Sequence, residues 1–116
     1  MIYMSNAALK CAADVCLELP NYQVIICPSL RSKRDDILGE ITDYIPSKAI
    51  NIHRILKSNS NCYIEFTNGN IIRIVTAHES CRGYKANLVE VDSEVSEEFI
   101  NTVLRPMEIK QLREKR

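Results

Sequence analysis

The sequence predicts a single α/β domain in which a small layered sheet is flanked by helices. Helical and strand-like segments alternate along its 116 residues, an order typical of sheets covered by helices. The run YQVIIC (22–27) is almost continuously apolar, which indicates a strand buried on both faces, as in a parallel sheet. An Asn-Gly pair (68–69) lies between two β-rich runs, and this is a strong hairpin signal.

Length and composition indicate one globular domain over residues 1–116. Halves of this chain would be too small to bury separate cores. Hydrophobic residues make up 46% and charged residues 26%, which excludes an intrinsically disordered protein. No apolar run reaches the length of a membrane span, and the N-terminal stretch lacks a basic leader, so we expect no membrane contact and a cytoplasmic location.

The charge balance bears on nucleic-acid binding. Fifteen basic and fifteen acidic residues give a formal net charge of zero. A protein that binds DNA through its whole surface is normally basic. The balance therefore disfavours DNA as a partner and leaves local basic patches open.

Two helices are expected in the first half of the chain. The first covers residues 5–19, with Ser5 as its N-cap. The second lies within residues 29–46, where Ser32 and Asp35 have the spacing of a capping box. Its apolar side chains share one helical face: Ile37, Leu38, Ile41, Tyr44 and Ile45.

The second half is expected to be mainly strand, with helix at the C-terminal end. Segment 47–61 fits a short helix about as well as a strand, and a helix is favoured. A helix capped by Ser96 and a last polar helix starting at Pro106 follow the strands. The strands are expected at 62–66, 71–77 and 87–92.

The five cysteines are expected to be buried, reduced thiols. Their number is odd, they form no C-x-x-C motif, and their spacing fits neither zinc nor a disulfide framework. Cys27 or Cys81 could be paired with His53 or His78 as a nucleophile, but no Asn or Asp pattern orients either histidine. The cysteines are Cys11, Cys16, Cys27, Cys62 and Cys81.

Asp92 ends the strand-like run NLVEVD (87–92). In nucleotide-hydrolysing α/β domains, a carboxylate at this place helps to hold the magnesium ion that neutralises the phosphates. The next residue is often an acid that orients the attacking water, and Ser93 is a poor substitute for it. Aspartate also commonly ends a strand to enter a turn, so both interpretations of Asp92 are open at this point.

Further motifs stand in a characteristic order around this aspartate. A Pro-Ser pair (28–29) follows the first strand, and the Asn-Gly hairpin precedes RGYKANLVEVD (82–92) and INTVLRP (100–106). Together they resemble the ATPase domain of the large terminase subunit, the DNA-packaging motor of tailed bacteriophages, over about residues 6–107. The resemblance implies a truncated P-loop ATPase core of the ASCE type in a bacterial host cell. It also implies that Asp92 is the Walker B metal ligand.

The sequence departs from this family at the positions that perform hydrolysis. It contains no G-K-S/T motif and begins at MIYMSNAALK, so we expect the phosphate-cradling Walker A loop and its preceding strand to be missing. Ser93 stands where the family places its catalytic glutamate, and Glu90 interrupts a strand that is usually apolar. We expect no ATP hydrolysis by the chain alone, and Mg-ATP as cofactor only if another polypeptide supplies the loop.

The other candidates for nucleotide, DNA or partner contact are Arg31, Lys33 and Arg34, and then Arg82, Gly83 and Lys85. The first group lies at the start of an expected helix, where its charge opposes the dipole unless an anion or acidic partner is near. A solvated surface is the simpler interpretation of this group. The second group lies in the loop before Asp92, in a region that a terminase uses close to nucleotide or DNA.

Three functions are compatible with these observations. The chain could work with another polypeptide as part of a packaging ATPase. It could be a stand-alone, non-catalytic phage protein that binds a protein partner, as an inhibitor of host defence, a decoy or a regulator of the motor. It could also be an α/β domain that binds a small molecule. Under the first two, the sheet edge uncovered by the missing strand predicts a dimer or a complex.

Overall fold

A six-stranded mixed sheet forms the centre of the molecule. The computed structural model describes residues 1–59, 61–78 and 83–109. The strands are β1 (Ile2–Tyr3), β2 (Gln23–Cys27), β3 (Ile52–Lys57), β4 (Cys62–Phe66), β5 (Ile71–Ile74) and β6 (Leu88–Val91). Their order is β1-β6-β2-β5-β4-β3. The first four in this order are parallel, and β4 and β3 join antiparallel, which confirms the α/β class.

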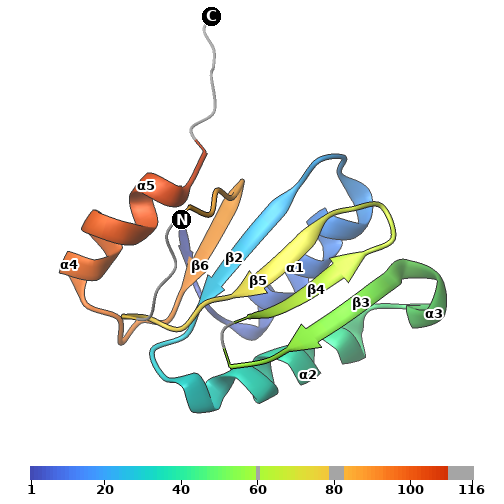
Figure 1. Cartoon of the computed structure of the whole chain (residues 1–116), viewed down its shortest axis with the longest axis horizontal. Helices are drawn as coiled ribbons and strands as arrows, with labels where there is room; N and C mark the ends of the chain where they lie inside the picture. Colours follow the sequence, from blue (N-terminus) through green and yellow to red (C-terminus); the bar gives the residue numbers. More distant parts are fainter. Residues whose placement is uncertain (60, 79–82, 110–116) are drawn as a thin grey trace, which may run out of the picture.

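Helices pack on both faces of this sheet (Figure 1). On one face lie α1 (Asn6–Glu18) and α2 (Arg34–Tyr44), the latter preceded by a 3₁₀ turn at Arg31–Lys33. The C-terminal segment on the other face runs without a break through α4 (Glu97–Phe99), a π-helical turn (Ile100–Leu104) and α5 (Arg105–Met107). No helix in the described ranges is long and apolar enough to cross a membrane.

Strand β2 is buried on both faces, as its apolar run predicts. Val24 and Ile26 pack into the cluster beneath α1 and α2. Ile25 and Cys27 pack into the second cluster, beneath the C-terminal helical segment. Parallel neighbours on both sides, β5 and β6, satisfy its backbone.

The helix and hairpin signals are confirmed at several positions. Ser5 caps α1 by accepting a hydrogen bond from Ala8 N, and Ser96 caps α4 by accepting one from Phe99 N. The turn between β4 and β5 contains Gly69 at φ +92°, a conformation that glycine adopts without strain.

A strand precedes α1, contrary to the expectation that it would be missing. Ile2 pairs with Glu90 and Tyr3 with Val91, and Met4 N donates to Val91 O at 2.9 Å. The strand has two residues, too few to show any periodicity in the sequence.

Segment 47–61 contains a short helix followed by a longer strand, so the favoured helix is confirmed only in its first part and is wrong for β3. Helix α3 covers only Lys48–Asn51, and β3 then pairs antiparallel with β4. Because β3 is an edge strand with a mainly exposed pattern, it lacks the alternation that marks a half-buried strand.

Three local details of the helices also differ from expectation. Ser32 lies inside the 3₁₀ turn, and α2 begins without a side-chain cap, so the capping box does not form. Tyr44 is exposed, and its hydroxyl donates to Asp14 Oδ1 at 2.9 Å. Pro106 lies within α5, which ends one residue later. The expected last helix falls mainly on residues 110–116, outside the described ranges.

The cysteine prediction is confirmed at three positions and wrong at one. Cys16, Cys27 and Cys62 are buried thiols, whereas Cys11 is exposed on α1. Burial raises the pKa of the Cys16 thiol to about 12, which keeps it protonated and unreactive at neutral pH. Cys81 lies outside the described residues.

Candidate functional site

The carboxyl ends of β2 and β6 bring two distant segments together. These strands are parallel neighbours, so the residues that follow them lie at the same edge of the sheet. Asp92 N extends the strand pairing by donating to Cys27 O at 3.0 Å. This places the carboxylate of Asp92 beside the Pro28-Ser29 pair.

Ser29, Lys33 and Asp92 form one hydrogen-bonded cluster, called the Asp92 cluster below. Asp92 Oδ2 accepts from Ser29 N at 3.2 Å and from Ser29 Oγ at 2.7 Å. It also accepts from Lys33 Nζ at 2.6 Å, and Lys33 Nζ lies 3.2 Å from Ser29 Oγ. The other oxygen, Oδ1, accepts from Glu94 N at 3.3 Å. Both carboxylate oxygens are therefore engaged within the chain.

These contacts fix the charges of the cluster. Burial acts to raise the pKa of Asp92, but hydrogen bonds from Lys33 and Ser29 outweigh it and hold that pKa well below its usual range. The hydrogen bond with Asp92 raises the pKa of Lys33. Asp92 is thus an anion and Lys33 an ammonium at neutral pH. A protonated lysine cannot act as the base that would activate the Ser29 hydroxyl.

The ammonium of Lys33 lies where a cation bound to Asp92 would have to sit. A metal ion there would have to displace Lys33 from Oδ2, since a cation already holds that oxygen. Residues 1–59, 61–78 and 83–109 contain no group of three or more His, Cys, Asp or Glu side chains placed to hold a metal. The role of Asp92 as a metal ligand stays a prediction.

The structure separates the other basic candidates at the start of α2 from this cluster. Arg31 donates to the backbone oxygen of Asn59 and to its side-chain Oδ1, the latter at 3.2 Å. Arg34 donates to Ser58 O at 3.1 Å. Both arginines thus hold the loop after β3 against α2. Ser93, next to Asp92, is exposed in the turn that follows β6.

Gly83 and Lys85 lie at the opposite end of the sheet. They line a pocket with residues at the start of β2 and just before β6, whereas Asp92 follows the carboxyl ends of these strands. Gly83 has φ +87°, and Lys85 Nζ donates to Pro106 O at 3.2 Å. Arg82 lies outside the described residues. The structure therefore does not bring this group together with Asp92.

Ser29 is the member of the cluster that the sequence did not single out as a site residue. Its signal was the Pro-Ser pair directly after a buried strand. The Pro-Ser pair points to the site only when β2, which it follows, is known to lie beside β6, which Asp92 follows.

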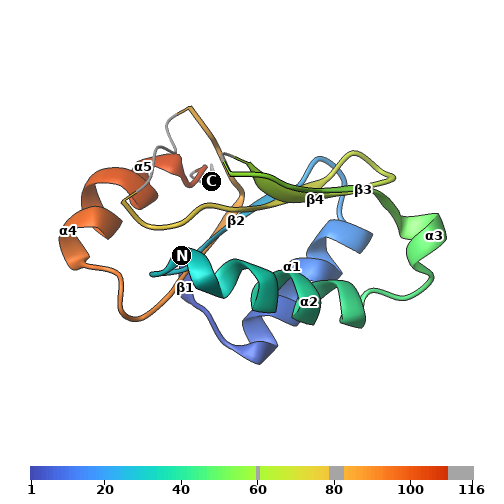
Figure 2. The same cartoon turned by 60° about the horizontal axis from the view of Figure 1, so that its bottom comes forward.

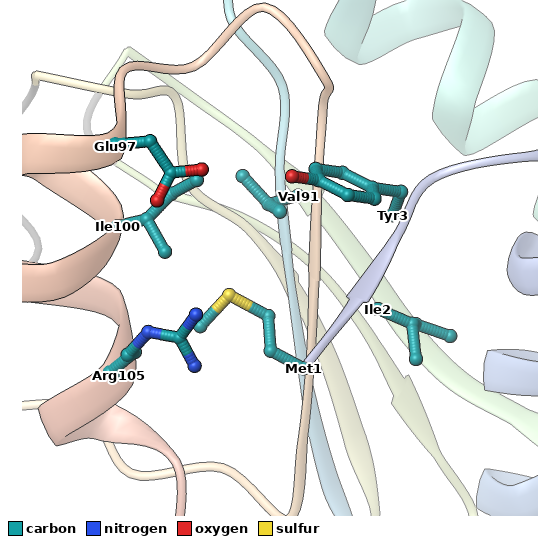
Figure 3. A pocket seen from close by; sticks show the side chains of 7 residues that line it. All are labelled: Met1, Ile2, Tyr3, Val91, Glu97, Ile100 and Arg105. Carbon is teal, nitrogen blue, oxygen red and sulfur yellow. The ribbon is translucent and has the colours of Figure 1, made fainter.

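A small pocket lies on the other side of β6, between β1 and the C-terminal helical segment (Figure 3). The Tyr3 hydroxyl points towards Val91, and Glu97 and Arg105 face it from the helices. The volume of this pocket is about 100 Å³, below the roughly 300–1,000 Å³ of typical small-molecule sites. The lining residues are Met1, Ile2, Tyr3, Val91, Glu97, Ile100 and Arg105.

Glu90 is a buried acid in the middle of β6. Its side chain is fully buried, and neither carboxylate oxygen has a hydrogen-bond partner in the described part of the chain. It pairs in register with Ile26, a residue of the cluster beneath α1 and α2. Burial raises the pKa of Glu90 to about 8, so the carboxyl is mainly neutral at pH 7.

The Asp92 cluster is thus a charge-compensated group at the carboxyl edge of a mostly parallel sheet. Its members come from the ends of two strands and the 3₁₀ turn before α2. A function for the chain has to be inferred from such residues and their geometry. Comparisons with protein-family models, curated proteins and solved structures gave no match.

Proposed function

We propose that the chain is a terminase-like α/β domain that does not hydrolyse ATP on its own and acts by binding a protein partner. The contact between Lys33 Nζ and Asp92 Oδ2, at 2.6 Å, carries the proposal. A carboxylate that serves Mg-ATP has to offer an oxygen to the magnesium ion or its water. Here a lysine of the same chain neutralises that carboxylate.

The connection between β1 and α1 supports the same conclusion. In P-loop domains, the loop between a strand and the following helix wraps the phosphates with backbone amides. Two residues make this connection here, Met4 and Ser5. Met4 N donates to Val91 O, and Ser5 Oγ caps the helix. So short a turn cannot enclose a triphosphate.

The edges of the sheet support a protein partner or a second copy of the chain. Edge strands offer backbone groups to which another chain can add a strand. Strand β3 is six residues long and pairs on one side with β4, and Ile55 on it is 46% exposed. At the other edge, β1 exposes Tyr3. In a phage-infected bacterial cell, the partner would be a host defence protein or the packaging motor itself.

Calorimetry with Mg-ATP tests the proposal. We expect no binding at millimolar nucleotide by the wild-type chain. The matched variants are Asp92→Asn, which removes the anion of the cluster, and Asp36→Asn, which removes an exposed carboxylate on α2. Binding by the wild type that survives Asp36→Asn but disappears in Asp92→Asn would overturn the proposal and restore a nucleotide site.

The partner half of the proposal has its own test. Sedimentation measures whether the chain self-associates and whether Ile55→Asp on β3 prevents it. Ile50→Asp on α3, an apolar residue that is 71% exposed, is the control. Loss of association in Ile55→Asp alone identifies a second copy as the partner. Wild-type monomers that also fail to bind candidate motor and defence proteins would refute the partner role.

A further inference from the structure

Within the described residues, one face of strands β3, β4 and β5 has no helix packed on it. Helices α1 and α2 lie beneath β3, β4 and β5, whereas the C-terminal helices pack on the opposite face at the end of the sheet formed by β6 and β2 (Figure 2). The open face of β3 to β5 is called the open face below. It carries the side chains of β4 and β5 that alternate with buried Ile64, Phe66 and Ile72, together with their register partners on β3: Tyr63, Glu65, Ile71, Arg73, Arg54 and Leu56.

Planar side chains form a continuous row on the open face. Arg73 Cζ lies 4.5 Å from the centre of the Tyr84 ring and 5.4 Å from that of Tyr63. Arg54 Cζ lies 5.9 Å from the centre of the Tyr63 ring. The Tyr84 hydroxyl donates to Asn61 Oδ1 at 3.3 Å, which fixes the end of the row. These distances are those of cation–π contacts.

A polar pocket continues this row. Its volume is about 380 Å³, within the range of small-ligand sites. Arg73 and Tyr84 belong to both the row and the pocket. Amide side chains and a lysine complete most of the lining: Asn21, Gln23, Asn87 and Lys85. A base edge could find both donors and acceptors among these amides.

The charges of the described residues on this surface favour an anionic ligand. Arg54, Arg73 and Lys85 are cationic, and Glu65 is the acid among them. Glu65 Oε1 lies 3.9 Å from Arg54 Nε, and so loose a pair on an exposed surface contributes little. The row and the pocket therefore combine planar groups with net positive charge, although the whole chain is neutral.

We propose that the open face binds single-stranded nucleic acid. Bases stack on the planes of Tyr63, Arg73 and Tyr84, and phosphates lie near Arg54 and Lys85. Aromatic rings and guanidinium planes are the groups on which proteins stack unpaired bases. A duplex fits poorly because its bases are already stacked on one another. The pocket lies at the start of β2, whereas the Asp92 cluster follows the carboxyl end of that strand, and the row extends from the pocket along the sheet, with Arg73 paired in register with Ile25.

This proposal is tested by measuring the binding of an oligothymidylate of about 12 nucleotides. That length is within the range of single-strand binding sites. The chain contains five tyrosines and no tryptophan, so quenching of tyrosine fluorescence reports stacking directly. Fluorescence anisotropy of a labelled oligonucleotide gives the affinity. We expect quenching by the single strand and much weaker binding of a duplex of the same length.

Two substitutions separate stacking from charge. Tyr63→Leu should weaken binding at least about fivefold, which is the effect of losing one stacked base. Tyr44 is an exposed tyrosine on α2, and the control variant Tyr44→Leu should leave the affinity unchanged. Arg73→Lys keeps the charge and loses the plane, so it should weaken binding without changing the salt dependence. Arg105→Lys on α5 is its control. Circular dichroism establishes that each variant is folded.

Photocrosslinking of a bromodeoxyuridine oligonucleotide to the wild-type chain keeps the proposal testable if a variant fails to fold. Crosslinks at Tyr63 or Tyr84 support it. Absence of binding, equal affinity of the Tyr63→Leu variant, or equally strong binding of the duplex would each overturn it. Competition by polyglutamate as effective as that by the oligonucleotide would also overturn it, in favour of an acidic protein segment.

Discussion

Lys33 Nζ and Asp92 Oδ2 lie 2.6 Å apart, although the two residues are separated by 59 positions in the chain. The Asp92 side chain is 12% exposed and that of Lys33 is 39% exposed. The carboxylate is therefore the more deeply buried partner, and it depends on the ammonium for compensation. Removing the lysine leaves a largely buried anion with only hydrogen bonds to support it.

Replacing Lys33 by Met should lower the stability at neutral pH and make the stability less dependent on acid. A group whose pKa is lowered by folding contributes stability above its unfolded pKa of about 4, and this contribution is lost as the pH falls towards the folded pKa. Without Lys33, burial brings the folded pKa of Asp92 up towards or above its unfolded value, so the variant is less stable at neutral pH and loses less stability than the wild type as the pH falls through about 4. Urea unfolding between neutral and acid pH measures this shift.

Lys57→Met is the matched control for that experiment. Lys57 Nζ lies 3.2 Å from Asp35 Oδ1, but both side chains are largely exposed. Exposed ion pairs contribute about 0–1 kcal/mol, so the acid limb of the stability curve should stay close to that of the wild type. Identical curves for Lys33→Met and the wild type would show that Lys33 does not set the charge of Asp92.

Glu90 should make the fold less stable as the pH rises. Its pKa is raised to about 8 by burial, whereas an unfolded glutamate ionises near pH 4.3. Between these values, folding takes up a proton, and the free energy of unfolding falls by up to about 1.4 kcal/mol per pH unit. In Glu90→Gln this dependence should disappear, which urea unfolding at several pH values measures.

Glu65→Gln provides the comparison for Glu90. Glu65 is only partly buried, on β4. Its removal should therefore not change how the free energy of unfolding depends on pH between pH 5 and 8, which is about the window set by the two pKa values of Glu90. If the free energy of unfolding falls equally with pH in the wild type and in Glu90→Gln, the ionised Glu90 carboxylate must have a partner in the folded protein.

Asn70 should be important for stability because it connects the hairpin turn to the end of α1. Its side chain is 2% exposed. Oδ1 accepts from Tyr22 N at 2.8 Å, and Nδ2 donates to Cys16 O and Leu19 O at 2.9 and 2.6 Å. Asn70→Ala removes the partners of Tyr22 N and Leu19 O, whereas Cys16 O keeps a hydrogen bond from Asn68 Nδ2 at 2.8 Å. The variant should lower the free energy of unfolding by about 1–3 kcal/mol. Thermal and urea unfolding measure this change.

Asn101→Ala controls for the loss of an amide as such. Asn101 Oδ1 accepts from Arg105 Nε at an exposed position, so its loss should change stability by about 0.5 kcal/mol or less. If both variants have the same stability, the buried hydrogen bonds of Asn70 contribute nothing beyond those of a surface amide.

The parts of the fold predicted from the sequence are those with a local signal. Ser5 marked the start of α1, and the Asn-Gly at 68–69 marked the hairpin. Strand β3 was missed because His53 and Arg54 interrupt its apolar pattern at an exposed edge. Strand β1 was missed because a strand of two residues is too short to show an alternation of apolar and polar side chains.

The site was predicted in part for a related reason. Asp92 was recognisable because it ends an apolar strand, and Lys33 was noted as a charge at a helix start. Their contact depends on β6 lying beside β2, and a strand order set by long-range pairing leaves no trace in local patterns. The 3₁₀ turn that contains Lys33 also replaced the expected capping box.

The place of β6 has a consequence for how the chain reaches this fold during synthesis. Strand β6, residues 88–91 and the last strand among the described residues, lies between β1 and β2, which precede it in the chain. A nascent chain that ends before this strand has no neighbour for β1 and leaves one edge of β2 open. Strands β2 to β5 can pair with one another before then, but β1 can join the sheet only after residues 88–91 have been made.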